Sequence, residues 1–467
     1  MQAYVSDNTT TTTTTNNNSS SSSSSSIMAS SPEKKRPKGT DLSLFVVDVD
    51  GEKWRKCAGA AVLNSDDHIL VGQRRIVVQQ DESNGTDEPT TKTVSTWQCP
   101  QGGVKKKTNG QKGRVVGEQH DDDDDDDDEK ELMAAQVAAQ EEEESIAEAS
   151  SRELYKEMGL KVDTHVMIVG NNNGKNNTKR KQLAKTATTT LLSPVTPVAV
   201  RYRTPTSSWL SKAGFAGQEL HWAIFRCTDA RGDADPTLMC KLFQSCSNNN
   251  NPDGEAEFSN VAWQPIGTVV DHAWQAKRQA YAALQKTLEN VVLPQWQEQV
   301  QTLDFSGTWL RDWMDCAQAL MRRGLSYEQA ITEAEKPYVQ KWERGSLAEQ
   351  SWVVTTYNVD GVTPRRTLEY KKGEWDEYYS GQSTLFGTSS SGGATLKRRT
   401  CYVAEPEAEP LPVAHATVTL GPKGIEEARR YLKAGQMMVR RTLWSNETPD
   451  EPVVSTEIFL RSTMTRD

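Results

Sequence analysis

The sequence predicts an α+β domain followed by an all-β antiparallel domain, and three observations predict it. Between residues 41 and 293, short apolar strand patterns alternate with amphipathic helical patterns, the last of which runs from about Val270 to Val292. From residue 300 to 467, short segments rich in Trp, Tyr, Thr and Val follow a helical pair, which indicates a sandwich or a closed antiparallel barrel. Residues 1–40 consist of Thr, Asn and Ser runs that cannot bury apolar surface, so we expect a disordered tail.

Composition excludes several classes of protein. The net charge of −10 argues against a general nucleic-acid coat, although Asp121–Asp128 and Glu141–Glu144 contribute much of it. The 7 cysteines form no C-x-x-C pair, which excludes the common zinc-site spacing and indicates reduced thiols. No apolar run approaches the roughly 20 residues of a membrane span. We expect a cytoplasmic location, with nucleus and organelle left open.

The residues that carry chemistry lie in two separated pieces. Residues 97–103, W-Q-C-P-Q-G-G, end a predicted strand at a glycine turn, and an insertion of about 105–143 follows. The second piece begins at Glu144 and continues seven residues later as R-E-L-Y-K-E-M-G-L, residues 152–160. Glu153 and Glu157 are four residues apart, so a helix places them on one face, where their carboxylates can hold a divalent cation.

The joined pieces resemble the Nudix box, and the W-Q-x-P-Q-G-G lead-in resembles the branch of RNA 5′-pyrophosphohydrolases and dinucleoside polyphosphate hydrolases. The resemblance implies a Nudix fold over residues 41–293, a mixed sheet between helices with insertions at about 105–143 and 171–196. It implies Mg²⁺ or Mn²⁺ as cofactor, bound by Glu153 and Glu157 with support from Glu144 and the backbone oxygen near Gly102.

The same resemblance assigns further site residues. Arg152 is expected to hold a glutamate in place, and Glu257 or Glu157 is the candidate base for the attacking water. The substrate-binding candidates are Arg55, Arg74, Tyr202, Lys277 and Arg278. The implied partner is a nucleoside polyphosphate or an RNA 5′ end, cleaved at a phosphoanhydride bond.

Two departures from the family pattern leave an alternative open. Lys156 stands where the pattern has a glutamate, and the insertion separates the glycines from Glu144. Surface glutamates on an ordinary amphipathic helix would give the same R-E-L-x-K-E string. The alternative is therefore a catalytically weakened scaffold that binds a nucleotide, a lipid or another protein.

The C-terminal segment opens with F-S-G-T-W at residues 305–309, followed by a helix, a turn, a helix and Lys336-Pro337. This order resembles the calycin barrels of fatty-acid-binding proteins and lipocalins, and it implies a β-barrel over residues 300–467 with a helical lid. A lipid ligand or a protein partner is implied with it. Arg440, Arg441 and Arg461 on late strands are candidates for holding a ligand carboxylate, and a structural role is the alternative for each.

Overall fold

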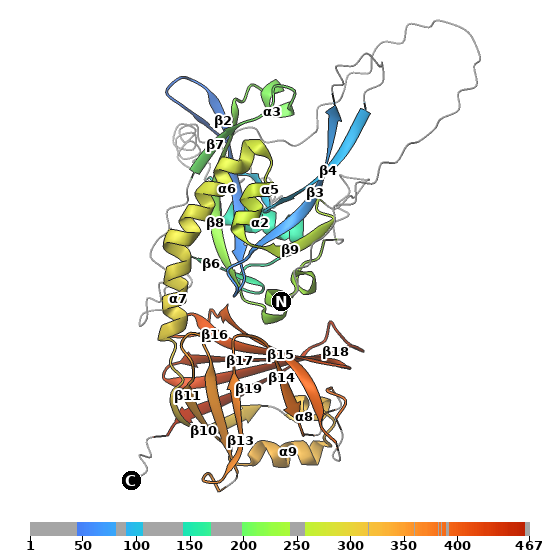
Figure 1. Ribbon diagram of the computed structural model, residues 1–467, viewed down its shortest axis with the longest axis vertical. Coiled ribbons are helices and arrows are strands. Elements are labelled where there is room, and N and C mark those ends of the chain that lie inside the picture. The colour runs from blue at the N-terminus through green and yellow to red at the C-terminus, as the bar shows by residue number, and fades with distance from the viewer. Residues whose placement is uncertain are drawn as a thin grey trace, which may run out of the picture. The chain divides into compact units, whose positions relative to one another are not determined.

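The structure is a computed structural model, and it describes residues 44–80, 90–105, 143–169, 199–242 and 257–462, apart from short gaps at 316, 359, 382, 384 and 389–391. The predicted tail and the two predicted insertions lie outside these residues. The described chain is largely β, and residues 42–467 form one compact unit (Figure 1). Within the described residues, no helix is long and apolar enough to cross a membrane.

The first sheet is mixed and its central strands run in the order β4-β3-β2-β8-β6. Strand β2 pairs with β8 in parallel from Trp54 to Leu63, and the other pairings are antiparallel. At the sides, β1 and β5 pair with β2, β7 with β8, and β9 with β3. The strands are β1 (Phe45–Val47), β2 (Lys53–Leu63), β3 (Ile69–Gln80), β4 (Thr90–Gln98), β5 (Gln101–Gly103), β6 (Val166–Val169), β7 (Ala199–Arg203), β8 (Gly217–Cys227) and β9 (Asn260–Gln264).

Helices pack against both faces of this sheet. Side chains alternate along β2, so Ala60 and Val62 pack with α2 (Ile146–Met158), while Ala61 and Leu63 join the core beneath α6 (Gln275–Thr287). The predicted helix over residues 270–292 is divided in the structure. Helix α5 (Ile266–His272) ends at Ala273, whose backbone is extended, and α6 then continues through a π-helical turn, η3 (Leu288–Val292).

The remaining elements of this region are short. Helix α7 (Leu293–Thr302) leads out of the mixed sheet and carries the buried Trp296. The others are α3 (Trp209–Lys212), α4 (Ala230–Ala234) and η2 (Pro236–Leu238).

The second sheet is an antiparallel meander of ten strands in the order β13-β12-β11-β10-β19-β18-β17-β16-β15-β14. Helices α8 (Ala317–Arg322) and α9 (Tyr327–Glu335) follow its first strand, as the sequence predicts (Figure 1). The strands are β10 (Gly307–Asp315), β11 (Val339–Arg344), β12 (Trp352–Tyr357), β13 (Pro364–Tyr370), β14 (Gly373–Tyr379), β15 (Ala394–Ala404), β16 (Val413–Gly421), β17 (Gly424–Lys433), β18 (Gln436–Ser445) and β19 (Val453–Arg461).

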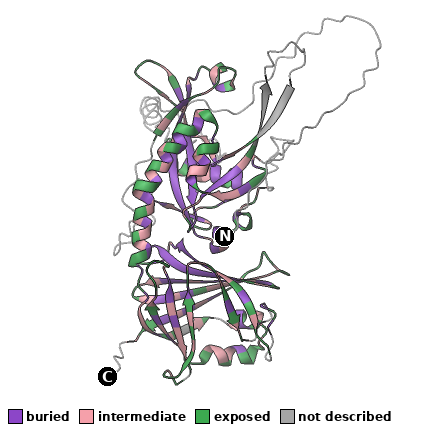
Figure 2. Cartoon of the chain, in the orientation of Figure 1, coloured by how far each residue is buried: buried purple, intermediate pink, exposed green. Residues whose placement is uncertain are grey.

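The sheet curves into a barrel whose two edges, β13 and β14, are consecutive in the chain. An ion pair between Arg366 on β13 and Glu377 on β14 joins these edges. Phe305, Trp309 and Trp342 are almost fully buried in the barrel core. Figure 2 shows buried residues along the strands of this sheet. The predicted antiparallel barrel with a helix pair is therefore confirmed, whereas its likeness to the calycin family stays a prediction.

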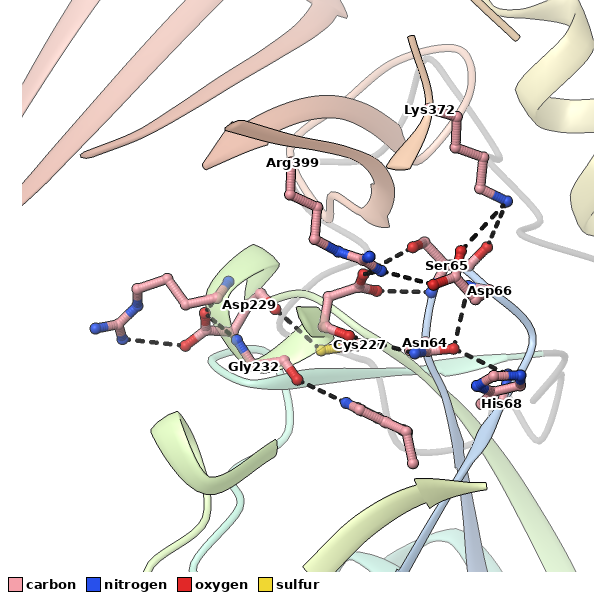
Figure 3. Close-up of polar contacts among 12 residues, drawn as sticks. Asn64, Ser65, Asp66, His68, Cys227, Asp229, Gly232, Lys372 and Arg399 are labelled. Atoms are coloured by element: carbon pink, nitrogen blue, oxygen red, sulfur yellow. Dashed lines mark hydrogen bonds and ion pairs between the residues drawn. The ribbon is translucent and has the colours of Figure 1, made fainter. Parts of the chain in front are cut away.

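Buried polar contacts connect segments of the two sheets (Figure 3). Asp233 on α4 accepts hydrogen bonds from the backbone nitrogen of Ser65, at 2.6 Å, and from its hydroxyl, at 2.7 Å. Arg399 on β15 pairs with Asp233 at 3.2 Å and with Asp66 at 2.7 Å. Because Asp233 is only 1% exposed, its charge depends on Arg399 for compensation.

Candidate active site and barrel cavity

Local sequence fixes both ends of the helix that carries the acidic residues. Ser145 caps the first turn of α2, and its side chain and that of Glu148 form a capping box. The helix ends at Gly159, which adopts the left-handed conformation with φ 73°. Between these caps, Glu153 and Glu157 lie on the face directed at the sheet and are 4% and 7% exposed.

Arg152 connects the two pieces that the insertion separates. Its guanidinium donates to both carboxylate oxygens of Glu144, at 3.0 and 2.9 Å, and to the carbonyl oxygen of Gly103 at 2.8 Å. Glu144 also accepts a hydrogen bond at 3.1 Å from the backbone of Lys105. The structure thus places the two ends of the insertion side by side, and Arg152 takes the positioning contact that the resemblance implies.

Gly102 leaves room for the carboxylate of Glu153. A Cβ atom at position 102 would lie 2.2 Å from the carboxyl carbon of Glu153, so no other residue fits without displacing this side chain. Two cations contact the same carboxylate, Arg152 on one oxygen and Lys156 on the other, with the Lys156 nitrogen at 3.2 Å. Lys156 therefore takes the position next to Glu153 that its sequence spacing predicts.

Glu157 lies in a crowd of like charges. Burial first, then Glu257 and Glu153, raise its pKa to about 9. Glu257, from the segment before β9, shares a hydrogen bond with Glu157 and pairs with Arg74 at 3.0 Å. The structure therefore brings Glu257 to the acidic helix, across 100 residues of sequence, and Arg74 with it.

Lys277 is the buried cation nearest to this cluster. Its ammonium donates to the side-chain oxygen of Gln98 at 3.1 Å. Burial first, and then the neighbouring Arg74, lower its pKa to about 8. Arg278 is exposed and donates to the carbonyl oxygen of Asp271 at 3.2 Å, so of the predicted basic pair only Lys277 is buried, where Glu157 and Glu257 act on its pKa through their charges.

The other two predicted substrate contacts lie on the far side of the glycine turn. Arg55 packs over the Trp209 ring at 5.4 Å, and its guanidinium fills the space beside Gly103. Tyr202 is buried in the core, and its hydroxyl donates to the side-chain oxygen of Gln218. The Tyr202 hydroxyl therefore contacts a neighbouring strand of the fold, whereas Arg55 lies beside the glycine turn at Gly103.

Among the described residues, no group of three or more His, Cys, Asp or Glu side chains is spaced to hold a metal ion. The donor set nevertheless fits a hard divalent cation in its chemistry, since Glu153, Glu157 and Glu257 supply carboxylate oxygens. Burial first, and then the like charges of Glu257 and Glu153, raise the pKa of Glu157, and a bound cation would relieve the repulsion among these carboxylates.

A cavity of about 560 Å³ lies in the barrel region, and the sequence predicted neither its volume nor most of its lining residues. Of the three late-strand arginines, Arg441 lines the cavity and Arg440 is exposed on the outside. Arg461 packs on Trp309 at 5.1 Å and donates to the carbonyl oxygen of Ser306. The missed lining arginines include Arg430, which shares one face of β17 with the buried Glu426 and Ala428. Side chains of a strand alternate between its two faces, and this alternation was the sequence signal that could have placed Arg430 on the cavity side.

Neither known protein-family profiles nor curated protein sequences match this chain. Several solved structures resemble 34% of it, and three of them are the following. The fluorescent protein UnaG matches over 97% of its own length, at 18% identity and a TM-score of 0.25. Zebrafish ileal bile acid-binding protein, crystallised with cholic acid, does so over 98% of its length, at 11% identity and a TM-score of 0.24. The Manduca sexta fatty-acid-binding protein does so over 100% of its length, at 17% identity and a TM-score of 0.24. The barrel assignment rests on the strand order and the helix pair.

Proposed function

We propose that this chain has two functional sites: a barrel that binds a small ligand, and a Nudix-type site that hydrolyses phosphoanhydride bonds with a divalent cation. The observation that supports the first is the partly open cavity of about 560 Å³, a volume within the range of small-molecule sites. A barrel filled for docking alone would have side chains in that space. A lipid or a nucleotide in this cavity would also fit a scaffold that binds a ligand without hydrolysing it.

The observation that supports the second site is the convergence of Glu153, Glu157 and Glu257 beside Gly102. Glu153 and Glu157, with Glu144 nearby, are the residues that would hold Mg²⁺ or Mn²⁺. When bound, such an ion neutralises phosphate oxygens and lowers the pKa of a coordinated water. Arg152 keeps Glu144 beside the glycine turn, so that the acidic residues stay in place across the insertion.

The protein's own residues suit the remaining steps of a hydrolysis. Glu257, paired with Arg74, stays available to accept the proton of an attacking water, while Glu157 shares its hydrogen bond. Lys277 supplies positive charge near Glu157 and Glu257, and Arg55 supplies it beside Gly103, so that both can attract a polyphosphate chain. The substrate class is nucleoside polyphosphates, with RNA 5′-triphosphate ends and dinucleoside polyphosphates first.

The test is phosphate or pyrophosphate release from 5′-triphosphate RNA, dinucleoside tetraphosphate and nucleoside triphosphates, with Mg²⁺ or Mn²⁺ and with EDTA. We expect cation-dependent turnover that Glu157→Gln reduces at least a hundredfold. Glu298→Gln, which changes an exposed glutamate on α7, is the matched control and should leave turnover unchanged. No turnover with either cation, together with retained nucleotide binding, would establish the weakened-scaffold alternative instead.

A further inference from the structure

The barrel cavity holds more positive than negative charge. Of the seven arginines that line it, Arg365 is exposed and the other six are buried or partly buried. Three buried glutamates compensate five of these six. Glu377 pairs with Arg366 and Arg398. Glu426 pairs with Arg323 and Arg441. Glu457 pairs with Arg441 at 2.7 Å and with Arg311 at 3.9 Å. The sixth arginine is Arg430.

Arg430 has no acidic partner among the described residues. It is 4% exposed, and its guanidinium donates to the hydroxyl of Thr417 and to the carbonyl oxygen of Ala428, both at 3.2 Å. The Tyr370 and Trp342 rings flank it at 4.9 and 5.5 Å. A buried guanidinium without an anion costs several kcal/mol, so this residue is placed at the cost of stability. Such an arrangement is typical of a binding site.

Two groups on the cavity wall respond to the excess positive charge. Burial alone would raise the pKa of Glu426, but Arg323 and Arg441 lower it to about 2. Burial also acts to raise the pKa of the Tyr370 phenol, yet the surrounding arginines, Arg430 first, hold it below its ordinary value. An anion that enters the cavity would therefore meet a strongly positive potential.

We propose that this cavity binds a compact molecule with two or more negative charges, of the phosphate or pyrophosphate class, and not a long-chain fatty acid. The proposal rests on the ligand-binding function proposed for the barrel. A single carboxylate compensates one of the three excess charges, whereas a pyrophosphate group matches several guanidiniums, whose planar donors bind phosphate oxygens in pairs. The stacked Trp342 and Tyr370 rings, whose centroids are 5.9 Å apart, line the cavity beside these arginines.

Isothermal titration of the full chain in EDTA, with inorganic pyrophosphate and separately with oleate, tests this proposal. We expect pyrophosphate to bind and oleate not to bind. Arg430→Met should weaken pyrophosphate binding roughly tenfold to a hundredfold, as expected for the loss of a charge-assisted hydrogen bond. Arg440→Met, on the outside of the neighbouring strand, is the matched control and should bind as the unaltered chain does.

A stability readout separates a binding role for Arg430 from a structural one. Because Arg430→Met removes an uncompensated buried charge, its melting temperature should rise while binding falls. If that variant does not fold, Arg366→Gln decides the matter, since Glu377 keeps Arg398 as a partner and a weaker affinity for pyrophosphate is again expected. Binding of oleate but not of pyrophosphate overturns the ligand class and leaves the binding function. Binding of neither overturns both, and pyrophosphate affinity unchanged in the arginine variants places the anion elsewhere and refutes the proposal.

Discussion

The raised pKa of Glu157 makes the stability of this protein depend on pH in an unusual direction. In the unfolded chain this carboxyl titrates near its ordinary value of 4.5, whereas in the fold its pKa is about 9. Between these two values the folded state binds one proton more than the unfolded state. The free energy of unfolding therefore falls as pH rises from about 5 to 9, by up to about 1.4 kcal/mol per pH unit from this group.

Urea unfolding from pH 5.5 to 8.5 in EDTA measures this effect as a difference between the unaltered chain and Glu157→Gln. Titrating groups outside the acidic cluster contribute equally to both proteins and cancel in the difference. Glu257→Gln, which removes the nearest like charge, should flatten the dependence as well. Saturating Mn²⁺ should raise the stability most at pH 8.5, because the cation compensates the ionised carboxylates. Equal pH dependence in the unaltered chain and in Glu157→Gln would refute the reasoning about this cluster.

Three further predictions concern other contacts. Lys156→Glu replaces the cation that pairs with the buried Glu153 by a further carboxylate, so the melting temperature in EDTA should fall while Mn²⁺-dependent phosphate release rises; unchanged release would show that Lys156 does not limit the site. Gly102→Ala should reduce release at least tenfold by displacing Glu153, whereas Gly267→Ala, at a helical position with open space, should be neutral or stabilise by about 0.5 kcal/mol. Arg399→Met leaves the charge of Asp233 uncompensated, so urea unfolding should show a loss of about 3 kcal/mol, and a loss below about 1 kcal/mol would show that the pair is unimportant.

Features encoded by neighbouring residues could be predicted from the sequence, and features that depend on strand orientation could not. Helix α2 could be predicted because the spacing of its glutamates and the glycine at its end are encoded by neighbouring residues. Short strands with turn residues between them predicted an antiparallel sandwich or barrel, but not the order of its strands. Which of Arg440 and Arg441 faces inward depends on the register of β18, and a shift of one residue reverses it. The hydroxyl of Tyr202 could not be assigned either, because its partner lies on the neighbouring strand β8.

The tolerance of the acidic site for a long insertion follows from where its contacts lie. Lys105 and Glu144 border the insertion, and the backbone nitrogen of Glu144 donates to the carbonyl oxygen of Lys105 at 2.9 Å. The cost of closing a flexible loop grows only with the logarithm of its length, so a longer segment adds little once its ends are held together. Arg152 holds them, because one guanidinium contacts the carbonyl oxygen before the insertion and the carboxylate after it. The arginine of the motif, more than the length of the insertion, therefore determines whether the two pieces act as one site.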